Sequence, residues 1–164
     1  MNARVAPTIE GLQEGQIIPA MTLPATGNQS VDFNQLRGKK FVLYFYPKDS
    51  TPGCTVEGQE FTRFHKDFQD LNTEVFGVSR DSMKSHENFK SKQGYTIDLL
   101  SDSDEKLCNT FGVIRPKNMY GKQVMGIERS TFLVDESGKV IKAWRKVKAD
   151  GHAEEVLNYV KGMR

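Results

Sequence analysis

The sequence predicts an α/β protein, in which a mixed central sheet is flanked by helices as a three-layer sandwich and a hairpin lies near the N-terminus. Two observations predict this class. Apolar runs of strand length alternate with segments whose apolar residues have helical spacing. Two hairpin signals interrupt the alternation, which favours a mixed sheet over a purely parallel one. A chain of 164 residues is typical of one domain, so we expect a single domain over residues 1–164.

The first half of the chain predicts a hairpin, a central strand and a helix. Residues 22–23 and 30–33 flank a turn-forming stretch, which predicts the hairpin. Residues 41–46 are continuously apolar or aromatic, as is typical of a strand buried on both faces. After a turn-rich loop at 47–53, helical spacing relates the apolar side chains Phe61, Phe64, Phe68 and Leu71. Cys54 is therefore expected near a helix N-terminus.

The second half continues the alternation. Strands are expected over 74–79 and 97–100, and helices over 82–92 and 104–111. A second hairpin is expected from 129–135 and 139–144, which flank the turn sequence Glu136-Ser137-Gly138. An amphipathic helix over 153–160 completes the predicted fold.

Composition excludes several function classes. The net charge of +2 is too small to indicate a nucleic-acid partner. The longest apolar run, residues 41–46, is far shorter than the roughly 20 residues that a membrane span needs. Residues 1–21 contain charges and no long apolar stretch, so we expect no cleavable signal peptide and a cytoplasmic location.

The cysteines and histidines do not indicate a metal site. Two cysteines, Cys54 and Cys108, are too few for a disulfide-stapled scaffold or a structural zinc site. His65, His86 and His152 lie far apart in the sequence, and each is expected to be a surface or half-buried residue. We therefore expect neither a metal nor an organic cofactor.

Cys54 has neighbours that favour a chemical role. An unperturbed cysteine, with a pKa of about 8.5, is only about 3% thiolate at pH 7, whereas a pKa of about 6 gives about 90%. That shift corresponds to about 3.4 kcal/mol. A helix N-terminus contributes at most about 2 kcal/mol of this. A reactive thiolate at this position therefore requires a nearby cation, and arginine is the expected one.

The loop before Cys54 offers a hydroxyl and two rigid prolines. Thr51 lies three residues earlier, so its hydroxyl can lie beside the sulfur and either donate or accept a hydrogen bond. Pro47 and Pro52 fix the backbone and remove two donors, which suits a stiff, partly dehydrated pocket. The alternative interpretation is a simple strand-to-helix turn with a capping threonine and a buried cysteine. The combined arrangement of these residues favours the chemical role.

Two motifs carry a resemblance to a known family. Pro47-x-x-x-Thr51-x-x-Cys54 matches the active-site signature of the peroxiredoxins. The longer segment from Tyr46 to Thr55 resembles the bacterioferritin comigratory protein branch, also called peroxiredoxin Q. A second match, Gly126-Ile127-Glu128-Arg129-Ser130-Thr131-Phe132-Leu133-Val134-Asp135, is similar to the family segment that carries an arginine. The resemblance extends from about Gly15 to about Lys161.

The resemblance implies a thioredoxin-like fold and thiol-dependent reduction of hydrogen peroxide and organic hydroperoxides. By position, Cys54 is the peroxidatic cysteine, Thr51 the hydrogen-bonding hydroxyl and Arg129 the guanidinium, while Pro47 and Gly53 are substrate-binding residues. The thiolate attacks a peroxide oxygen, water or an alcohol leaves, and a sulfenic acid remains. Without the motif, Arg129 would be interpreted as a surface strand residue paired with a carboxylate such as Glu128.

The chain departs from the family pattern at the second cysteine. Many relatives have a resolving cysteine about five or about 36 residues after the first, and Gln59 and Lys90 occupy these positions here. Cys108 remains, and its shared helical face with Leu107 and Phe111 favours a small buried hydrophobe over a resolving role. We therefore expect recycling by an external thiol, either glutathione with glutaredoxin or thioredoxin.

Two other functions use the same fold. A general thiol-disulfide oxidoreductase needs a Cys-x-x-Cys pair at the helix start, and only one sulfur lies there, at Cys54. A non-catalytic holdase would not depend on Cys54 at all, and peroxide turnover with a thiol donor distinguishes it. The absence of a long exposed apolar stretch, together with the branch that the chain resembles, predicts a monomer.

Overall fold

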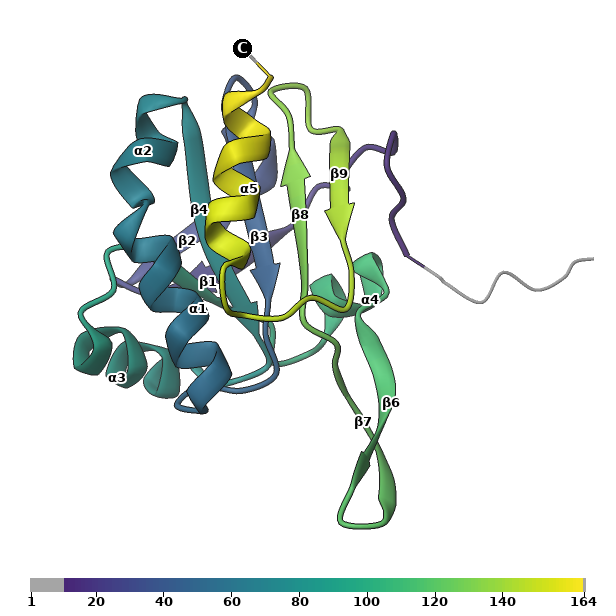
Figure 1. Cartoon of the computed structure of the whole chain (residues 1–164). Helices are drawn as coiled ribbons and strands as arrows, with labels where there is room; N and C mark the ends of the chain where they lie inside the picture. Colours follow the sequence, from purple (N-terminus) through teal and green to yellow (C-terminus); the bar gives the residue numbers. More distant parts are fainter. Residues whose placement is uncertain (1–10, 164) are drawn as a thin grey trace, which may run out of the picture.

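The computed structural model describes residues 11–163 and contains a seven-stranded mixed sheet (Figure 1). In sheet order the strands are β2 (Gln29–Asp32), β1 (Thr22–Ala25), β5 (Asp98–Ser101), β4 (Thr73–Ser79), β3 (Lys40–Phe45), β8 (Ser130–Val134) and β9 (Val140–Trp144). The helices are α1 (Pro52–Arg63), α2 (His65–Asp70), α3 (Met83–Gln93), α4 (Lys106–Phe111) and α5 (His152–Lys161), with a 3-10 turn η1 (Phe33–Leu36).

Strand directions confirm the predicted mixed sheet. β3 pairs in parallel with β4, and β4 pairs in parallel with β5. The β1–β2 and β8–β9 hairpins are antiparallel, and β8 also runs antiparallel to β3. Both predicted hairpins are therefore present, one toward each side of the parallel centre.

The side chains of β3 alternate between two apolar clusters because β3 lies in the interior of the sheet. One cluster contains Phe41, Leu43 and Phe45 and is covered by α4 and η1. The other contains Val42 and Tyr44 and is covered by α1, α2, α3 and α5. Helices therefore cover both faces of the sheet, as Figure 1 shows, and the three-layer prediction is confirmed.

One element was not predicted. β6 (Ile114–Met119) and β7 (Lys122–Ile127) form a separate two-stranded ribbon that projects from the body of the molecule (Figure 1). Tyr120 and Gly121 join the strands, both with positive φ, as a two-residue hairpin turn requires. Most of β7 is exposed, so the ribbon lacks the apolar alternation that identifies a half-buried strand.

The predicted helix that follows Cys54 is divided at Phe64, where α1 ends and α2 begins, although hydrogen bonds continue across that residue. No helix among residues 11–163 is long and apolar enough to cross a membrane. The expectation of no signal peptide falls partly on residues 1–10, outside the described residues.

Candidate active site

Cys54 lies in the first turn of α1, after the loop that follows β3. It is the third residue of that helix, after Pro52 at the first position, which confirms the predicted place near a helix N-terminus. Its side chain is 1% exposed. The backbone dipoles of the first turn favour negative charge at this point. The sulfur is therefore both shielded from solvent and close to a positive helix end.

Sheet register brings Arg129 to the same place. Phe45, at the end of β3, lies opposite Ser130, at the start of β8, so Arg129 lies beside the loop that leads to Cys54. Arg129 Nη2 lies 3.5 Å from Cys54 Sγ. A Cβ atom at Gly53 would lie 3.1 Å from that nitrogen, so the glycine leaves room for the guanidinium. The structure thus brings together Cys54, Arg129 and Gly53, as the sequence motif requires.

Glu57 is a member of this site that the sequence analysis missed. Its Oε1 accepts a hydrogen bond of 2.6 Å from Arg129 Nη1, and its side chain is fully buried. Glu57, rather than the suggested Glu128, is therefore the carboxylate partner found for Arg129. The available signal was spacing, because Glu57 lies three residues after Cys54 and so on the same helical face.

The Glu57 carboxyl is also incompletely satisfied. Its Oε2 has no hydrogen-bond partner among residues 11–163. Burial raises the pKa of Glu57 to about 7, although the neighbouring Arg129 charge opposes that rise. The carboxyl therefore gains or loses its charge near neutral pH. When it is charged, it fixes one end of the guanidinium whose other end contacts the sulfur.

The raised pKa predicts a pH dependence of stability. Between the ordinary Glu57 pKa of 4.5 and the folded value of about 7, the folded state binds more protons than the unfolded state. The Glu57 contribution to the free energy of unfolding is therefore greatest below pH 4.5 and falls as the pH rises toward 7, by about 3 kcal/mol in all. We expect Glu57→Gln to remove this fall in urea denaturation at pH 5 and pH 8.

The exposed Glu154 provides the control for that measurement. Glu154→Gln should retain the wild-type difference between the two pH values. An unchanged difference in Glu57→Gln would contradict the assignment of the pH dependence to Glu57.

Thr51 lies at the N-cap position of α1, but its side chain does not cap the helix. Its hydroxyl donates a hydrogen bond of 2.8 Å to the Lys48 carbonyl oxygen. Within the described part of the chain, the hydrogen bond to Cys54 Sγ comes from Arg129 alone, so no Thr51 hydroxyl bond to the sulfur is present. The oxygen lone pairs of Thr51 remain available as acceptors. Pro47, two residues after the end of β3, is half-buried.

Tyr95 supports the first turn of α1 and was also missed by the sequence analysis. Its hydroxyl donates a hydrogen bond of 2.9 Å to the Thr55 carbonyl oxygen. The ring packs on Gly58, where a Cβ atom would lie 2.3 Å from Tyr95 Cζ. Because its backbone partner at Thr55 is 40 residues away in the sequence, no local pattern could have indicated this contact.

Cys108 lies on the other side of the sheet from Cys54. It is fully buried in α4 and belongs to the apolar cluster that contains Phe45, whereas Cys54 belongs to the cluster that contains Tyr44. Burial raises the pKa of the Cys108 thiol well above its ordinary value. Cys108 therefore has the environment of a structural, unreactive cysteine.

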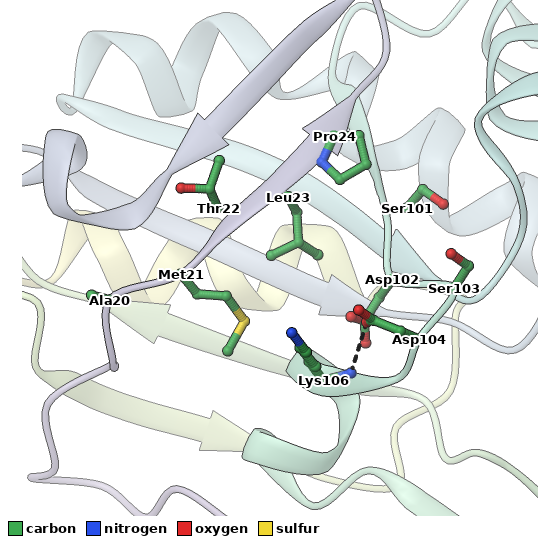
Figure 2. A pocket seen from close by; sticks show the side chains of 10 residues that line it. All are labelled: Ala20, Met21, Thr22, Leu23, Pro24, Ser101, Asp102, Ser103, Asp104 and Lys106. Carbon is green, nitrogen blue, oxygen red and sulfur yellow. Dashed lines mark hydrogen bonds between the residues drawn. The ribbon is translucent and has the colours of Figure 1, made fainter.

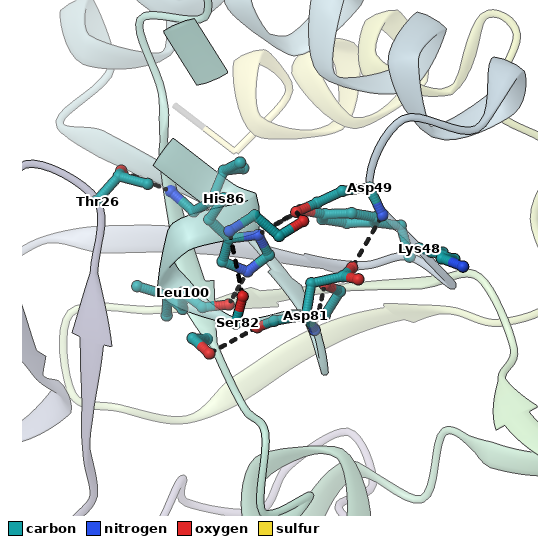
Figure 3. A network of polar contacts seen from close by, with 12 residues as sticks. Thr26, Lys48, Asp49, Asp81, Ser82, His86 and Leu100 are labelled. Carbon is teal, nitrogen blue, oxygen red and sulfur yellow. Dashed lines mark hydrogen bonds and ion pairs between the residues drawn. The ribbon is translucent and has the colours of Figure 1, made fainter. Parts of the chain in front are cut away.

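The histidine prediction was wrong at two of three positions. His86 and His152 are buried, and each has hydrogen-bond partners for both ring nitrogens, while His65 is half-buried as expected. His86 also joins Asp49 and Asp81, with ligand-type atoms within 4.8 Å of one another. The facing atoms of Asp49 and His86 already form hydrogen bonds within the protein, as Figure 3 shows.

A groove of about 640 Å³ lies elsewhere, between β1 and the connection from β5 to α4 (Figure 2). Asp102 lies in its lining, and its carboxylate accepts hydrogen bonds from the backbone N–H groups of Leu107 and Cys108. That carboxylate therefore caps the N-terminus of α4. The groove shares no lining residue with the Cys54 site.

The chain is similar to known proteins over most of its length. The AhpC/TSA family matches residues 15–143. The peroxiredoxin Bcp of Xanthomonas campestris pv. campestris is 52% identical over 148 residues, which cover 88% of this chain and 92% of the relative.

Solved structures are similar over nearly the whole length. The bacterioferritin comigratory protein of Xanthomonas campestris, studied for its alkyl peroxide reduction activity, superposes with a TM-score of 0.83 and 51% identity. That match covers 87% of this chain and 91% of the other. Peroxiredoxin Q of Xylella fastidiosa, in a mutant form with one cysteine changed to serine, gives a TM-score of 0.90 and 45% identity, and the match covers 94% and 98% of the two chains.

Proposed function

The chain belongs to the AhpC/TSA family and is a thiol-dependent peroxidase with a thioredoxin-like fold, and from this premise we propose that Cys54 carries the reaction. The observation that supports this most is the 3.5 Å approach of Arg129 Nη2 to a sulfur at the start of a helix. Two sources of positive potential then act on one thiol. Such an environment stabilises the thiolate, which is the nucleophile.

The proposed step is a displacement at oxygen. A lone pair of Cys54 sulfur forms an S–O bond, and the O–O bond breaks. Its electron pair leaves with the distal oxygen, which takes up a proton and departs as water or an alcohol. The sulfur is thereby oxidised to the sulfenic acid, and the peroxide is reduced.

Arg129 has two functions in this proposal. Its guanidinium balances the thiolate before attack and the charge that develops on the leaving oxygen during attack. The hydrogen bond from Nη1 to Glu57 holds the guanidinium in place while Nη2 faces the sulfur. Preorganised charge of this kind lowers the barrier because no reorientation is needed as the reaction proceeds.

Thr51, Pro47 and Gly53 are proposed to form the peroxide-binding surface. The Thr51 hydroxyl hydrogen is committed to the Lys48 carbonyl, so its oxygen can accept a hydrogen bond from a peroxide O–H group. Pro47 shields the site and Gly53 admits Arg129. The substrate class comprises hydrogen peroxide and organic hydroperoxides, as suggested by the alkyl peroxide reduction studied in a relative.

We infer that an external thiol completes the cycle. A thiol displaces water from the Cys54 sulfenic acid to give a mixed disulfide, and a second thiol releases the reduced enzyme as a disulfide forms. Glutathione with glutaredoxin, or thioredoxin, would provide these thiols. The positions of Cys54 and Cys108 in clusters on opposite sheet faces support this inference. A panel of the two reductant systems, assayed for peroxide-dependent turnover, tests it.

Cys108 provides a direct prediction. We expect Cys108→Ala to retain peroxide turnover with an external thiol within about twofold, because the thiol is buried and remote from the reacting sulfur. Wild-type protein treated with one equivalent of peroxide should show no Cys54–Cys108 disulfide by non-reducing peptide mass analysis. Detection of that disulfide as the main product would contradict the inference.

We also propose that the protein acts as a monomer in the cytoplasm, as one domain. Both cysteines are free, which suits a reducing compartment and an external thiol supply. Gel filtration coupled to light scattering, at the concentrations used for kinetics, tests the monomer.

A further inference from the structure

Asp49 is a buried anchor in the loop that joins β3 to α1. Asp49 is 5% exposed. The carboxylate accepts hydrogen bonds from the Tyr46 hydroxyl at 2.6 Å and the Ser85 hydroxyl at 2.7 Å, and lies 2.7 Å from His86 Nδ1. Its backbone N–H donates to Asp81 Oδ2 at 2.8 Å. The loop is therefore held by side chains from α3 and from the connection that precedes it.

His86 has two acceptors as partners. Its Nδ1 faces the Asp49 carboxylate, and its Nε2 lies 2.9 Å from the Leu100 carbonyl oxygen (Figure 3). A carbonyl oxygen can only accept, so Nε2 carries a proton. The 2.7 Å contact between Nδ1 and Asp49 Oδ2 joins a buried side chain of α3 to the buried carboxylate of the loop.

The anchored residue immediately precedes strained backbone. Ser50 follows Asp49 and has a φ of +65°, which is unfavourable for a residue other than glycine. Thr51 and Cys54 follow within the same loop and the first turn of α1. Contacts outside the loop must maintain this conformation. The buried hydrogen bonds next to Ser50 in the chain are those of Asp49.

Burial makes this anchoring relevant to the catalytic cycle. Cys54 is 1% exposed, so a thiol as large as glutathione cannot reach its sulfenic acid in the closed conformation. The loop or the first turn of α1 must open transiently for the second half of the cycle. This requirement rests on the proposed recycling by an external thiol.

We propose that Asp49 and His86 are a positioning pair. The pair holds closed the loop that joins β3 to α1, and thereby determines how often the Cys54 sulfur becomes accessible. The pair acts through the loop and does not touch the reacting atoms. Weakening this pair increases the small fraction of molecules in which the loop is open, while most molecules keep the loop closed. The rate of peroxide attack then changes little, while every step that needs the open form becomes faster.

Two substitutions of His86 separate the relevant hydrogen bonds. A glutamine amide nitrogen can replace Nε2 and retain the Leu100 contact, whereas an asparagine amide nitrogen can replace Nδ1 and retain the Asp49 contact. The two variants retain opposite bonds, so their comparison sets the bond to Asp49, which reaches the loop, against the bond to Leu100, which reaches β5.

The first measurement is the rate of Cys54 alkylation by iodoacetamide in the reduced native protein, assigned at the peptide level. We expect His86→Gln to react about tenfold faster than His86→Asn, which corresponds to losing one hydrogen bond to a charged acceptor. Adding 1 M urea distinguishes the route, because alkylation through global unfolding would accelerate at least about fivefold. Alkylation through local opening would respond much less.

The second measurement compares the two half-reactions. His86→Gln should reduce peroxide within about threefold of the wild-type rate, while its sulfenic acid should react with glutathione about tenfold faster than that of His86→Asn. Equal alkylation rates in the two variants, or a parallel loss of both half-reactions, would overturn the proposal. Ser91→Ala, at an exposed site on the same helix, is the control and should match wild type.

Ser85→Ala keeps the proposal testable if a His86 variant does not fold. It removes another donor to Asp49 from a half-buried position, and we expect alkylation to accelerate about threefold. An unchanged rate would overturn the proposal. A wild-type protein without Cys54-dependent peroxide consumption would instead contradict the proposed function, because alkylation does not depend on peroxidase activity.

Discussion

We expect Cys54→Ser to consume hydrogen peroxide no faster than buffer containing the thiol donor, a loss of at least about a thousandfold. A serine hydroxyl is a far weaker nucleophile than a thiolate at neutral pH, and its oxygen cannot form a sulfenic acid. The substitution retains nearly the same shape at a position that is 1% exposed, so the fold should persist. Stopped-flow peroxide consumption measures the loss, and thermal denaturation checks the fold.

Cys108→Ala is the matched control, because it removes the other buried cysteine. Its peroxide consumption should remain near that of wild type. Residual turnover above the buffer rate in Cys54→Ser, abolished by the additional Cys108→Ala substitution, would move the chemistry to Cys108 and contradict the proposed site.

Arg129→Ala should slow peroxide attack by about 10²- to 10³-fold, the effect of removing one preorganised charge from a reacting centre. The variant also leaves Glu57 buried without its partner. We expect a loss of about 3 kcal/mol in the free energy of unfolding at pH 8 and a smaller loss at pH 5, because a protonated Glu57 does not need the guanidinium. Single-turnover kinetics and urea denaturation measure the two effects.

A double variant separates the two functions of Arg129. Arg129→Ala with Glu57→Gln removes both buried charges, so stability at pH 8 should largely return while peroxide attack remains slow. Arg129→Lys should give an intermediate rate of peroxide attack. A single ammonium cannot face both Glu57 and the sulfur, as the two nitrogens of the guanidinium do. Recovery of the rate in the double variant would show that Arg129 acts only through stability.

The parts of the fold that could be predicted are those with a local pattern. The continuous apolar run of β3 and the Pro-rich loop before Cys54 indicated a buried strand followed by a reactive helix start. The β6–β7 ribbon could not be predicted in this way. Its strands pair only with each other, and most of β7 is exposed, so no apolar periodicity marks the ribbon. Tyr120-Gly121 is also not a strong turn sequence.

The candidate site divides in the same way. The requirement for a cation near Cys54 followed from the energetics of a thiolate, and the motif indicated Arg129. Glu57 was visible only as helical spacing, and its burial depends on how α1 packs. Tyr95 and His86 act on the loop and helix from distant positions, through contacts that exist only after the sheet has formed. Tertiary structure alone determines such contacts.

In the proposed cycle, the seven-stranded sheet also determines how long an oxidised molecule survives. It separates the two sulfur atoms, so the protein has no internal route out of the sulfenic acid. During the wait for outside thiol, a second peroxide can convert the same sulfur to the sulfinic acid, which ordinary thiols do not reverse. When thiol runs short, individual molecules are therefore permanently inactivated rather than merely paused.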